Sequence, residues 1–139
     1  MTPVLPFTLR AASESEMAGT DLAWDAYRFH GVARIDGDEL VLEWGGEIER
    51  STMEGTSMST TIDPVPTRRV RVPGGRLGIA ELRGGWWRPR LEVVVADLDA
   101  LAALPGSRQG RAVLRIARRD RGLALEFAAG LDGLRASAP

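Results

Sequence analysis

One strand-like run that leads directly into one amphipathic helical pattern constrains this fold more than any other feature. Apolar and polar residues alternate over residues 111–118, which is the period of a strand. Leu123, Phe127, Leu131 and Leu134 then recur at helical spacing and form one apolar stripe. Short strand patterns and turns occupy the preceding chain. Many strands followed by one helix predict a mainly β fold in which the helix covers an open end.

The clearest strand pair lies at residues 24–35 and 40–44. Both segments alternate with a period of two, and Asp36-Gly37 between them is a strong hairpin signal. The sequence therefore predicts an antiparallel hairpin at this point. The side chains expected to face the core are Tyr27, Phe29, Ala33 and Ile35 on the first strand and Leu40, Leu42 and Trp44 on the second.

Further elements are predicted between turns that contain glycine or proline. Leucines that recur every three residues among alanines predict a short helical turn over 97–104. Pro89 is expected at an edge or a bulge, because proline has no N–H group for a strand ladder. Asp120 occupies the expected N-cap position of the last helix. Additional strands are predicted at residues 68–72, 77–82, 86–96 and 111–118.

Two segments have weaker patterns. Residues 45–67 are polar and rich in Ser and Thr, and they fit either an exposed strand pair or a long mobile loop. Residues 1–22 are expected to form a partly ordered N-terminal arm, with a short strand at 7–9 and a flexible loop over 11–20. The chain length of 139 residues then predicts a single domain over 23–139.

The composition excludes several kinds of chemistry. The chain has no cysteine, which excludes disulfides, thiolate nucleophiles and cysteine metal sites. It has no lysine, which excludes Schiff-base chemistry and the lysine of a phosphate-binding loop. His30 is the single histidine, so we predict no metal and no cofactor. No apolar run is long enough to span a bilayer and no signal-peptide pattern is present, so the expected location is the cytoplasm.

Charge is distributed unevenly along the chain. Residues 1–66 contain 12 acidic residues and 4 arginines, whereas residues 67–139 contain 7 acidic residues and 14 arginines. The two halves can neutralise each other across a sheet, or they can leave a basic face for anionic partners. The isoelectric point near 5.9 is unlike that of a nucleic-acid-binding domain, so no nucleic-acid partner is expected.

The order of these elements resembles the pleckstrin-homology-like superfamily. The resemblance covers residues 24–136, and Arg118-Arg119-Asp120-Arg121, where a strand runs directly into the helix, is most similar to the uncharacterised bacterial branch. It implies a split barrel of about seven antiparallel strands in two near-orthogonal sheets, capped by one C-terminal helix. In lipid-binding members, basic residues around the first hairpin hold the headgroup. The corresponding turn is acidic here, Ile35-Asp36-Gly37-Asp38-Glu39, so peripheral membrane contact is not expected.

Aromatic and basic side chains gather in one segment and form the main candidate interaction surface. On a strand, Trp86 and Trp87 point to opposite faces, so at most one of them is naturally a core residue. In a purely structural alternative, one tryptophan fills the barrel and the other packs under a neighbouring loop or the N-terminal arm. Arginines on a second predicted strand form another candidate surface, and they are expected to pair with acidic residues of 36–54. The candidate residues are Arg83, Trp86, Trp87, Arg88 and Arg90 in the first segment, and Arg69 and Arg71 in the second.

Three classes of function follow from these residues. The first is a non-catalytic binding module for a protein partner or a second copy of the chain, through the candidate surface or a sheet edge. The second is a carrier or sensor that holds a small molecule or lipid in the barrel interior. The third is an enzyme with His30, Glu43, Glu47 or Glu49 as acid–base groups, which requires two of them to converge in a cleft. We predict the first class, because the sequence contains no assembled catalytic set.

Overall fold

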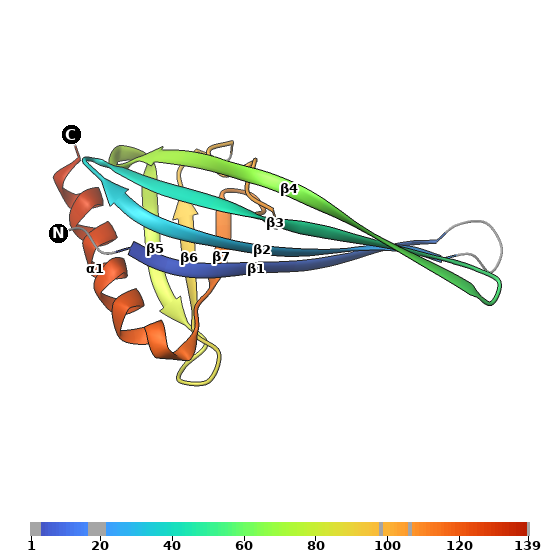
Figure 1. Ribbon diagram of the computed structural model, residues 1–139. Helices are drawn as coiled ribbons and strands as arrows, with labels where there is room; N and C mark the ends of the chain where they lie inside the picture. Colours follow the sequence, from blue (N-terminus) through green and yellow to red (C-terminus); the bar gives the residue numbers. More distant parts are fainter. Residues whose placement is uncertain (1–3, 17–21, 98, 106, 139) are drawn as a thin grey trace.

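The described part of the chain consists of strands followed by one helix. The computed structural model describes residues 4–16, 22–97, 99–105 and 107–138 (Figure 1). Within these residues the fold is mainly β, with antiparallel strands and one C-terminal helix, as the sequence predicts. The elements are β1 (Val4–Glu16), β2 (Leu22–Asp36), β3 (Glu39–Glu54), β4 (Ser57–Pro73), η1 (Gly74–Arg76), β5 (Leu77–Arg83), β6 (Arg90–Val95), β7 (Arg111–Arg115), η2 (Arg118–Asp120) and α1 (Arg121–Ser137).

The strands form a single seven-stranded sheet in the order β4-β3-β2-β1-β7-β6-β5. Strands β4 and β5 are therefore its two edges, and the sheet is not closed into a barrel. Strand β1 pairs with β2 along its whole length but meets β7 at one pair, Thr8 and Arg115. The sheet thus has a four-stranded part and a three-stranded part joined at a narrow seam. The expected closure into a split barrel and division into two sheets are not confirmed.

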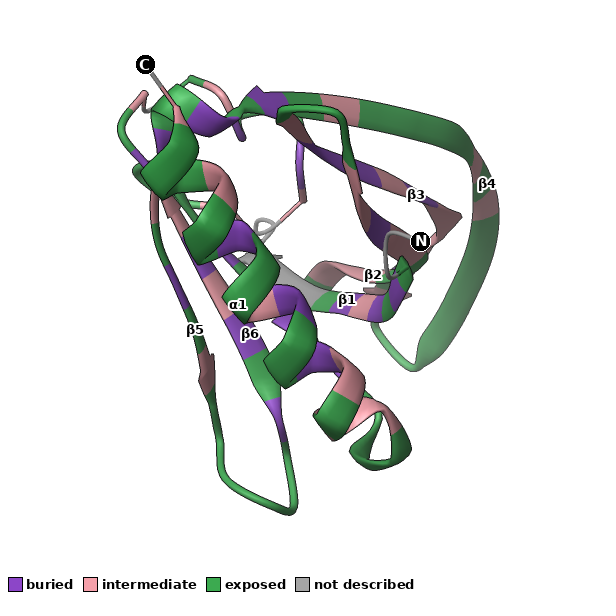
Figure 2. Ribbon diagram, turned by 90° about the vertical axis from the view of Figure 1, so that its left-hand side faces the viewer, coloured by how far each residue is buried: buried purple, intermediate pink, exposed green. Residues whose placement is uncertain are grey.

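The helix covers one end of the curved sheet. In Figure 2, α1 runs across the opening between β5 and β6 on one side and the β1–β4 strands on the other. Phe127 and Leu131 are buried, while Leu123 and Leu134 are half-buried and pack against the same core. The predicted apolar stripe of the helix is confirmed. The helix contains three glycines and therefore depends on this burial for its stability.

The predicted first hairpin is also confirmed. Its turn is Gly37 with Asp38, between the paired residues Asp36 and Glu39. Every side chain predicted to face inward lies in the core or packs against it. Phe29, Ala33, Leu40, Leu42 and Trp44 are buried, and Tyr27 and Ile35 are half-buried against them.

Residues 45–67 are strands, and the loop alternative is wrong. Strands β3 and β4 pair from Glu39 and Pro73 to Glu54 and Ser57. Gly45 and Gly46 lie at a bulge inside β3, where the register shifts between Trp44 and Gly46. Pro64 and Pro66 lie within β4, because an edge strand tolerates proline on its unpaired side.

The far ends of β1–β4 extend beyond the body as a twisted ribbon, which we call the arm (Figure 1). We define the arm as residues 12–16, 22–26 and 49–62, because Ala12, Ala26, Glu49 and Ile62 form one row across the four strands. Among the side chains described in the arm, Ser51 alone is buried. The remaining described residues, with the helix, form the body.

Strand β1 is longer than the sequence predicts. We expected a strand at 7–9 and a loop from residue 11, but β1 continues to Glu16. The loop prediction is therefore wrong for residues 11–16, and residues 17–21 lie outside the described residues. Strand β2 supplies the physical reason, because it offers a continuous ladder along the whole of β1 even where the sequence has no apolar alternation.

Three other boundaries differ from the sequence prediction. The strand predicted at 86–96 begins at Arg90 and the one predicted at 111–118 ends at Arg115. Where a short helical turn was predicted, residues 97 and 99–104 form a series of hydrogen-bonded turns, with the Leu104 N–H donating to the Leu101 carbonyl at 3.0 Å. Pro89 precedes β6, where its carbonyl accepts the Ile116 N–H at 3.0 Å. Asp120 occupies the N-cap position, but its side chain makes no capping hydrogen bond.

Candidate interaction surface

The loop between β5 and β6 presents two tryptophans to solvent. Trp86 is 68% exposed and Trp87 is 73% exposed, so neither fills the core. The expectation of a strand with one tryptophan inward is wrong, because Gly84 and Gly85 adopt positive φ angles and turn the chain out of the sheet. A Cβ atom at Gly84 would overlap the carbonyl oxygen of Arg88, so the loop needs glycine there.

Three arginines lie in one row on the outer face beside this loop. Arg83 of β5 pairs in register with Arg90 of β6, which pairs with Arg115 of β7. Like charges opposite one another destabilise a sheet unless acidic groups intervene. Glu92 supplies part of that compensation, since its carboxylate lies 3.0 Å from Arg83 Nε and 3.5 Å from Arg90 Nε. No described acidic residue pairs with Arg115.

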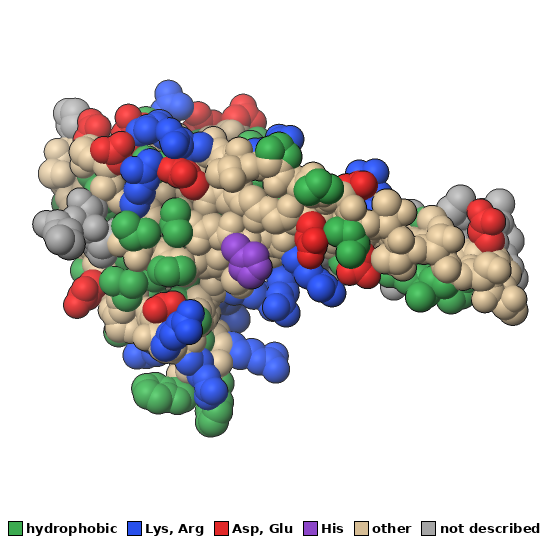
Figure 3. All heavy atoms as spheres, viewed as in Figure 1, with side chains coloured by type: hydrophobic (Ala, Val, Ile, Leu, Met, Phe, Trp, Pro, Cys, Tyr) green, Lys and Arg blue, Asp and Glu red, His purple; other side chains and the backbone are tan. Residues whose placement is uncertain are grey.

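An open groove runs from the tryptophan loop onto this arginine row, and we call it the Trp87 groove. Its volume is about 620 Å³. The guanidinium carbon of Arg118 lies 4.8 Å from the centre of the Trp87 ring, which is a cation–π distance. Green and blue side chains gather over the β5–β6 loop at the lower end of Figure 3. The groove is lined by Trp87, Arg88, Pro89, Arg90, Val113, Arg115, Ile116 and Arg118.

The charge of the groove is largely uncompensated. Within the described residues, neither Arg88 nor Arg118 has an acidic partner, and Arg115 has none either. Guanidinium groups hydrogen-bond carboxylates with two parallel donors and stack on aromatic rings. This arrangement suits an extended anionic chain that also carries apolar or aromatic groups.

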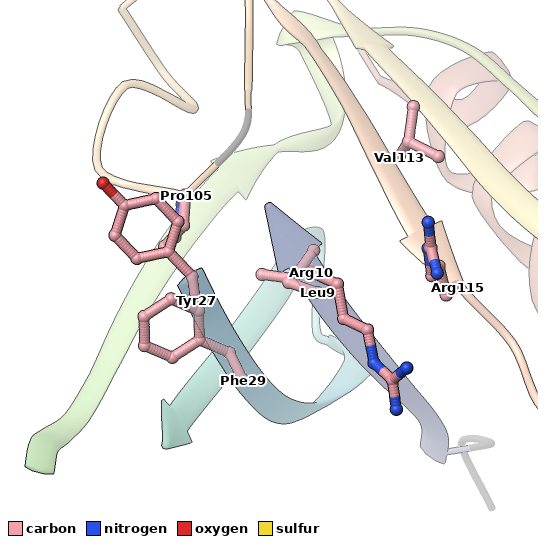
Figure 4. Close-up of a pocket in the computed structure, with 7 residues that line it drawn as sticks. All are labelled: Leu9, Arg10, Tyr27, Phe29, Pro105, Val113 and Arg115. Carbon is pink, nitrogen blue, oxygen red and sulfur yellow. The ribbon is translucent and has the colours of Figure 1, made fainter. Parts of the chain in front are cut away.

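A second, smaller pocket opens at the seam between β1 and β7. It holds about 160 Å³ and shares Val113 and Arg115 with the Trp87 groove. Figure 4 shows Arg10 on β1 and Arg115 on β7, with Tyr27 and Phe29 on the far side of Leu9. The positive face therefore continues from the Trp87 groove to the first strand.

The structure separates the seven candidate residues into two groups. Arg83, Trp86, Trp87, Arg88 and Arg90 lie on or beside the β5–β6 loop, as the sequence suggested.

Arg69 and Arg71 lie on β4, at the other edge of the sheet. Arg69 Nε is 3.3 Å from Glu43, and Arg71 is 3.2 Å from Asp36, so the expected pairing with acidic residues of 36–54 is confirmed.

Sequence reasoning missed three arginines of this surface. Arg10, Arg115 and Arg118 were not among the candidates, although they line the two pockets. The alternation in β7 could have identified Arg115. Ala112 and Leu114 are buried, so the residues that alternate with them, including Arg115, lie on the outer face. No sequence signal places Arg10 beside β7, because that contact depends on long-range strand order.

Two of the acid–base candidates, His30 and Glu43, lie close together, and arginines pair with Glu43 and Glu49. His30 is exposed on β2, and Glu43 lines the same shallow depression. The Glu43 carboxylate accepts a hydrogen bond from Arg34 at 2.7 Å and also pairs with Arg69. Glu49 pairs with Arg28 at 3.5 Å. Within the described residues, no group of three His, Asp or Glu side chains is placed to hold a metal ion.

Comparisons with known proteins identified no relative of this chain. No family model, curated protein or solved structure matches the chain. Among the described residues, no helix has the length and apolar character needed to cross a membrane. The geometry of the candidate surface therefore carries the functional argument.

Proposed function

We propose that this protein is a non-catalytic binding module whose Trp87 groove contacts an acidic segment of a partner protein. The observation that carries the proposal is the combination of two exposed tryptophans with arginines that lack acidic partners in the described residues. Exposed tryptophan and arginine side chains are the residues that most often dominate protein–protein binding energies. The Arg118 guanidinium over the Trp87 ring helps to orient that side chain before binding, which lowers the entropy cost of binding.

The chemistry of the groove supports a peptide ligand over a nucleic acid. The surface is basic, but the chain as a whole has a formal net charge of −1. The first 66 residues, which contain the whole arm, are strongly acidic and would repel a long polyanion. A short acidic peptide segment avoids that repulsion, because it covers the groove and no more of the molecule.

The decisive experiment replaces both loop tryptophans. A partner is captured from the native host with tagged wild-type protein, identified, and its affinity measured by titration with a peptide from its acidic segment. The variant Trp86→Ala/Trp87→Ala should lose at least about tenfold in affinity, since hot-spot tryptophans contribute 2 kcal/mol or more. Arg118→Ala should weaken binding less and flatten its salt dependence.

Ile79→Ala is the matched control. Ile79 is an exposed apolar residue on β5, it is 54% exposed, and it lies outside the Trp87 groove. The control should bind like wild type. Equal affinity of wild type and the double tryptophan variant would contradict the proposal.

The carrier function remains a second proposal, supported by an apolar pocket at the end of the body away from the helix. It holds about 330 Å³, within the lower part of the range for small-molecule sites. Tyr27, Phe29, Trp44 and Ile48 supply much of its wall. Enhanced fluorescence of an apolar dye, lost in the pocket-filling variant Ile48→Trp, would support this function. Unchanged dye fluorescence on adding wild-type protein would contradict it.

A pleckstrin-homology-like relationship also remains a proposal. The supporting observations are the four-stranded and three-stranded parts of the sheet, their single-pair seam and the helix over one end. An experimental structure in which β1–β4 and β5–β7 form two near-orthogonal sheets would support it. The acidic turn Asp36-Gly37-Asp38-Glu39 is exposed or half-exposed, which favours a protein partner over an anionic headgroup at that end.

A further inference from the structure

We propose that two copies of this chain pair through one segment of β4 in the arm, residues 57–62, and so join their sheets edge to edge. This inference concerns a surface far along the sheet from the Trp87 groove, and it does not depend on the proposed partner. Strand β4 is an edge of the sheet, so one side of its backbone has no partner strand in the described structure.

The unpaired backbone groups of this segment are identified by two observations. Strands β3 and β4 join through a two-residue turn between Glu54 and Ser57, so Ser57 bonds back to β3 and alternate residues after it point outward. Pro64 falls on the same outward alternation, as expected for a residue without an N–H group. The outward donors and acceptors of the segment are therefore those of Met58, Thr60 and Ile62.

The rest of the two sheet edges is guarded against pairing. Pro64, Pro66 and Pro73 remove donors along β4, and Arg69 and Arg71 place charges on it.

At the opposite edge, β5 is short, has an irregular register between Leu77 and Ala80, and is packed against α1. Residues 57–62, Ser-Met-Ser-Thr-Thr-Ile, contain no charge, no proline and no glycine. A neutral β-prone edge of this kind attracts another strand.

A second copy fits this edge because the segment is complementary to itself. Antiparallel pairing centred on Thr60 places Met58 opposite Ile62 of the second copy, and the converse contact follows by symmetry. Each opposed pair exchanges two backbone hydrogen bonds, because the outward residues face one another. Asp63 then opposes Ser57, so no like charges meet. The register is the one that a two-fold symmetric dimer requires.

Side chains on the same face extend the contact. Met58 is 61% exposed and Ile62 is 57% exposed, so both side chains are free to be covered by a second copy. Met58 is in register with Met53 of β3, and Met53 with Leu22 of β2. In the paired sheet, Ile62 of the second copy continues this apolar row. The contact is small, so we expect a weak, concentration-dependent dimer.

Sedimentation velocity over a concentration series tests the pairing and its register. Met58→Glu and Ile62→Arg should each raise the dimer dissociation constant about tenfold, because symmetry counts each substitution twice. The double variant Met58→Glu/Ile62→Arg should recover association, since the introduced carboxylate then faces the introduced guanidinium of the second copy. Within one copy, Ile62→Arg lies beside Glu49, so the substitution does not oppose folding.

Ile79→Glu is the matched control, because it places a charge on the other edge strand and should leave association unchanged. Hydrogen exchange at high protein concentration should slow at the N–H groups of Met58, Thr60 and Ile62 relative to dilute protein. A monomer at every concentration contradicts the proposal. So does a dimer that either single variant leaves intact, or a correctly folded double variant that stays monomeric.

Discussion

Strands β1–β4 run through two regions of the molecule, and the two regions are stabilised differently. In the body, one face of these strands is buried, with Leu40, Leu42 and Trp44 of β3 each at most 1% exposed. In the arm, the same strand buries only Ser51 among its described residues. Among the described elements, no helix and no second layer of strands lies over the arm (Figure 1).

The comparison shows that one ladder of hydrogen bonds can continue where hydrophobic burial stops. Strands β2 and β3 remain paired in the arm out to Leu22 and Met53. Replacing hydrogen bonds to water with hydrogen bonds between strands contributes little net free energy to folding. The arm therefore depends on its attachment to the body for its stability. We therefore expect the body to unfold as the cooperative unit and the arm to open locally at lower cost.

The largest expected effect that separates the two regions comes from removing one ring from the body. Phe127 of α1 is fully buried, so Phe127→Ala should lower the free energy of unfolding by about 3–5 kcal/mol. Met58→Ala in the arm removes a side chain that is 61% exposed and should cost under about 0.5 kcal/mol. Urea unfolding followed by circular dichroism measures both values. Similar losses would show that the arm is part of the cooperative core.

Two glycines of the long β3–β4 hairpin allow an intermediate comparison. Gly46 lies at the bulge between body and arm with φ +156°, and a Cβ atom there would overlap the Arg28 carbonyl oxygen. Gly46→Ala should therefore cost about 2–3 kcal/mol, because backbone atoms cannot easily move aside.

Gly55 at the tip of the arm is the matched position. It has φ +61° with no atom near its missing Cβ, and asparagine tolerates that conformation. Gly55→Asn should cost under about 1 kcal/mol in the same urea experiment. If the two substitutions prove equally costly, the bulge is not the strained junction that its geometry indicates.

The same difference explains how much of the fold the sequence revealed. Alternation in 24–35 and 40–44 predicted the first hairpin correctly, because one face of those residues is buried. Residues 45–67 lack alternation because most of their length buries neither face. The strands in 11–16 and 45–67 depend on partner strands that are distant in sequence. The local sequence therefore could not distinguish a strand from a loop there.

The candidate surface was recoverable to a similar degree. Composition alone marked the segment from Arg83 to Arg90, and the structure keeps those residues together. Both tryptophans are exposed because Gly84 and Gly85 turn the chain out of the sheet. The prediction of a strand at 86–96 did not take this turn into account. The contribution of Arg115 depended on the β6–β7 register, which a single sequence does not specify.

The smallest expected effect concerns two cross-strand ion pairs of the same kind. In the body, Arg34 and Glu43 lie 2.7 Å apart with side chains 33% and 23% exposed. In the arm, Arg50 and Asp63 lie 3.5 Å apart, at 58% and 47% exposure. Partial burial weakens solvent screening, so the Arg34–Glu43 pair should contribute up to about 1 kcal/mol and the Arg50–Asp63 pair close to zero.

Double-mutant cycles with alanine at each position measure the two coupling energies. Arg69→Ala is the background for the body cycle, because Arg69 also binds Glu43 and would otherwise mask part of the coupling. Added salt should reduce the Arg34–Glu43 coupling only partly, since its groups are half-buried. An exposed ion pair forms only if two long side chains are ordered, which costs free energy. A coupling energy in the arm as large as that in the body would therefore mean that the arm side chains are held more tightly than their exposure implies.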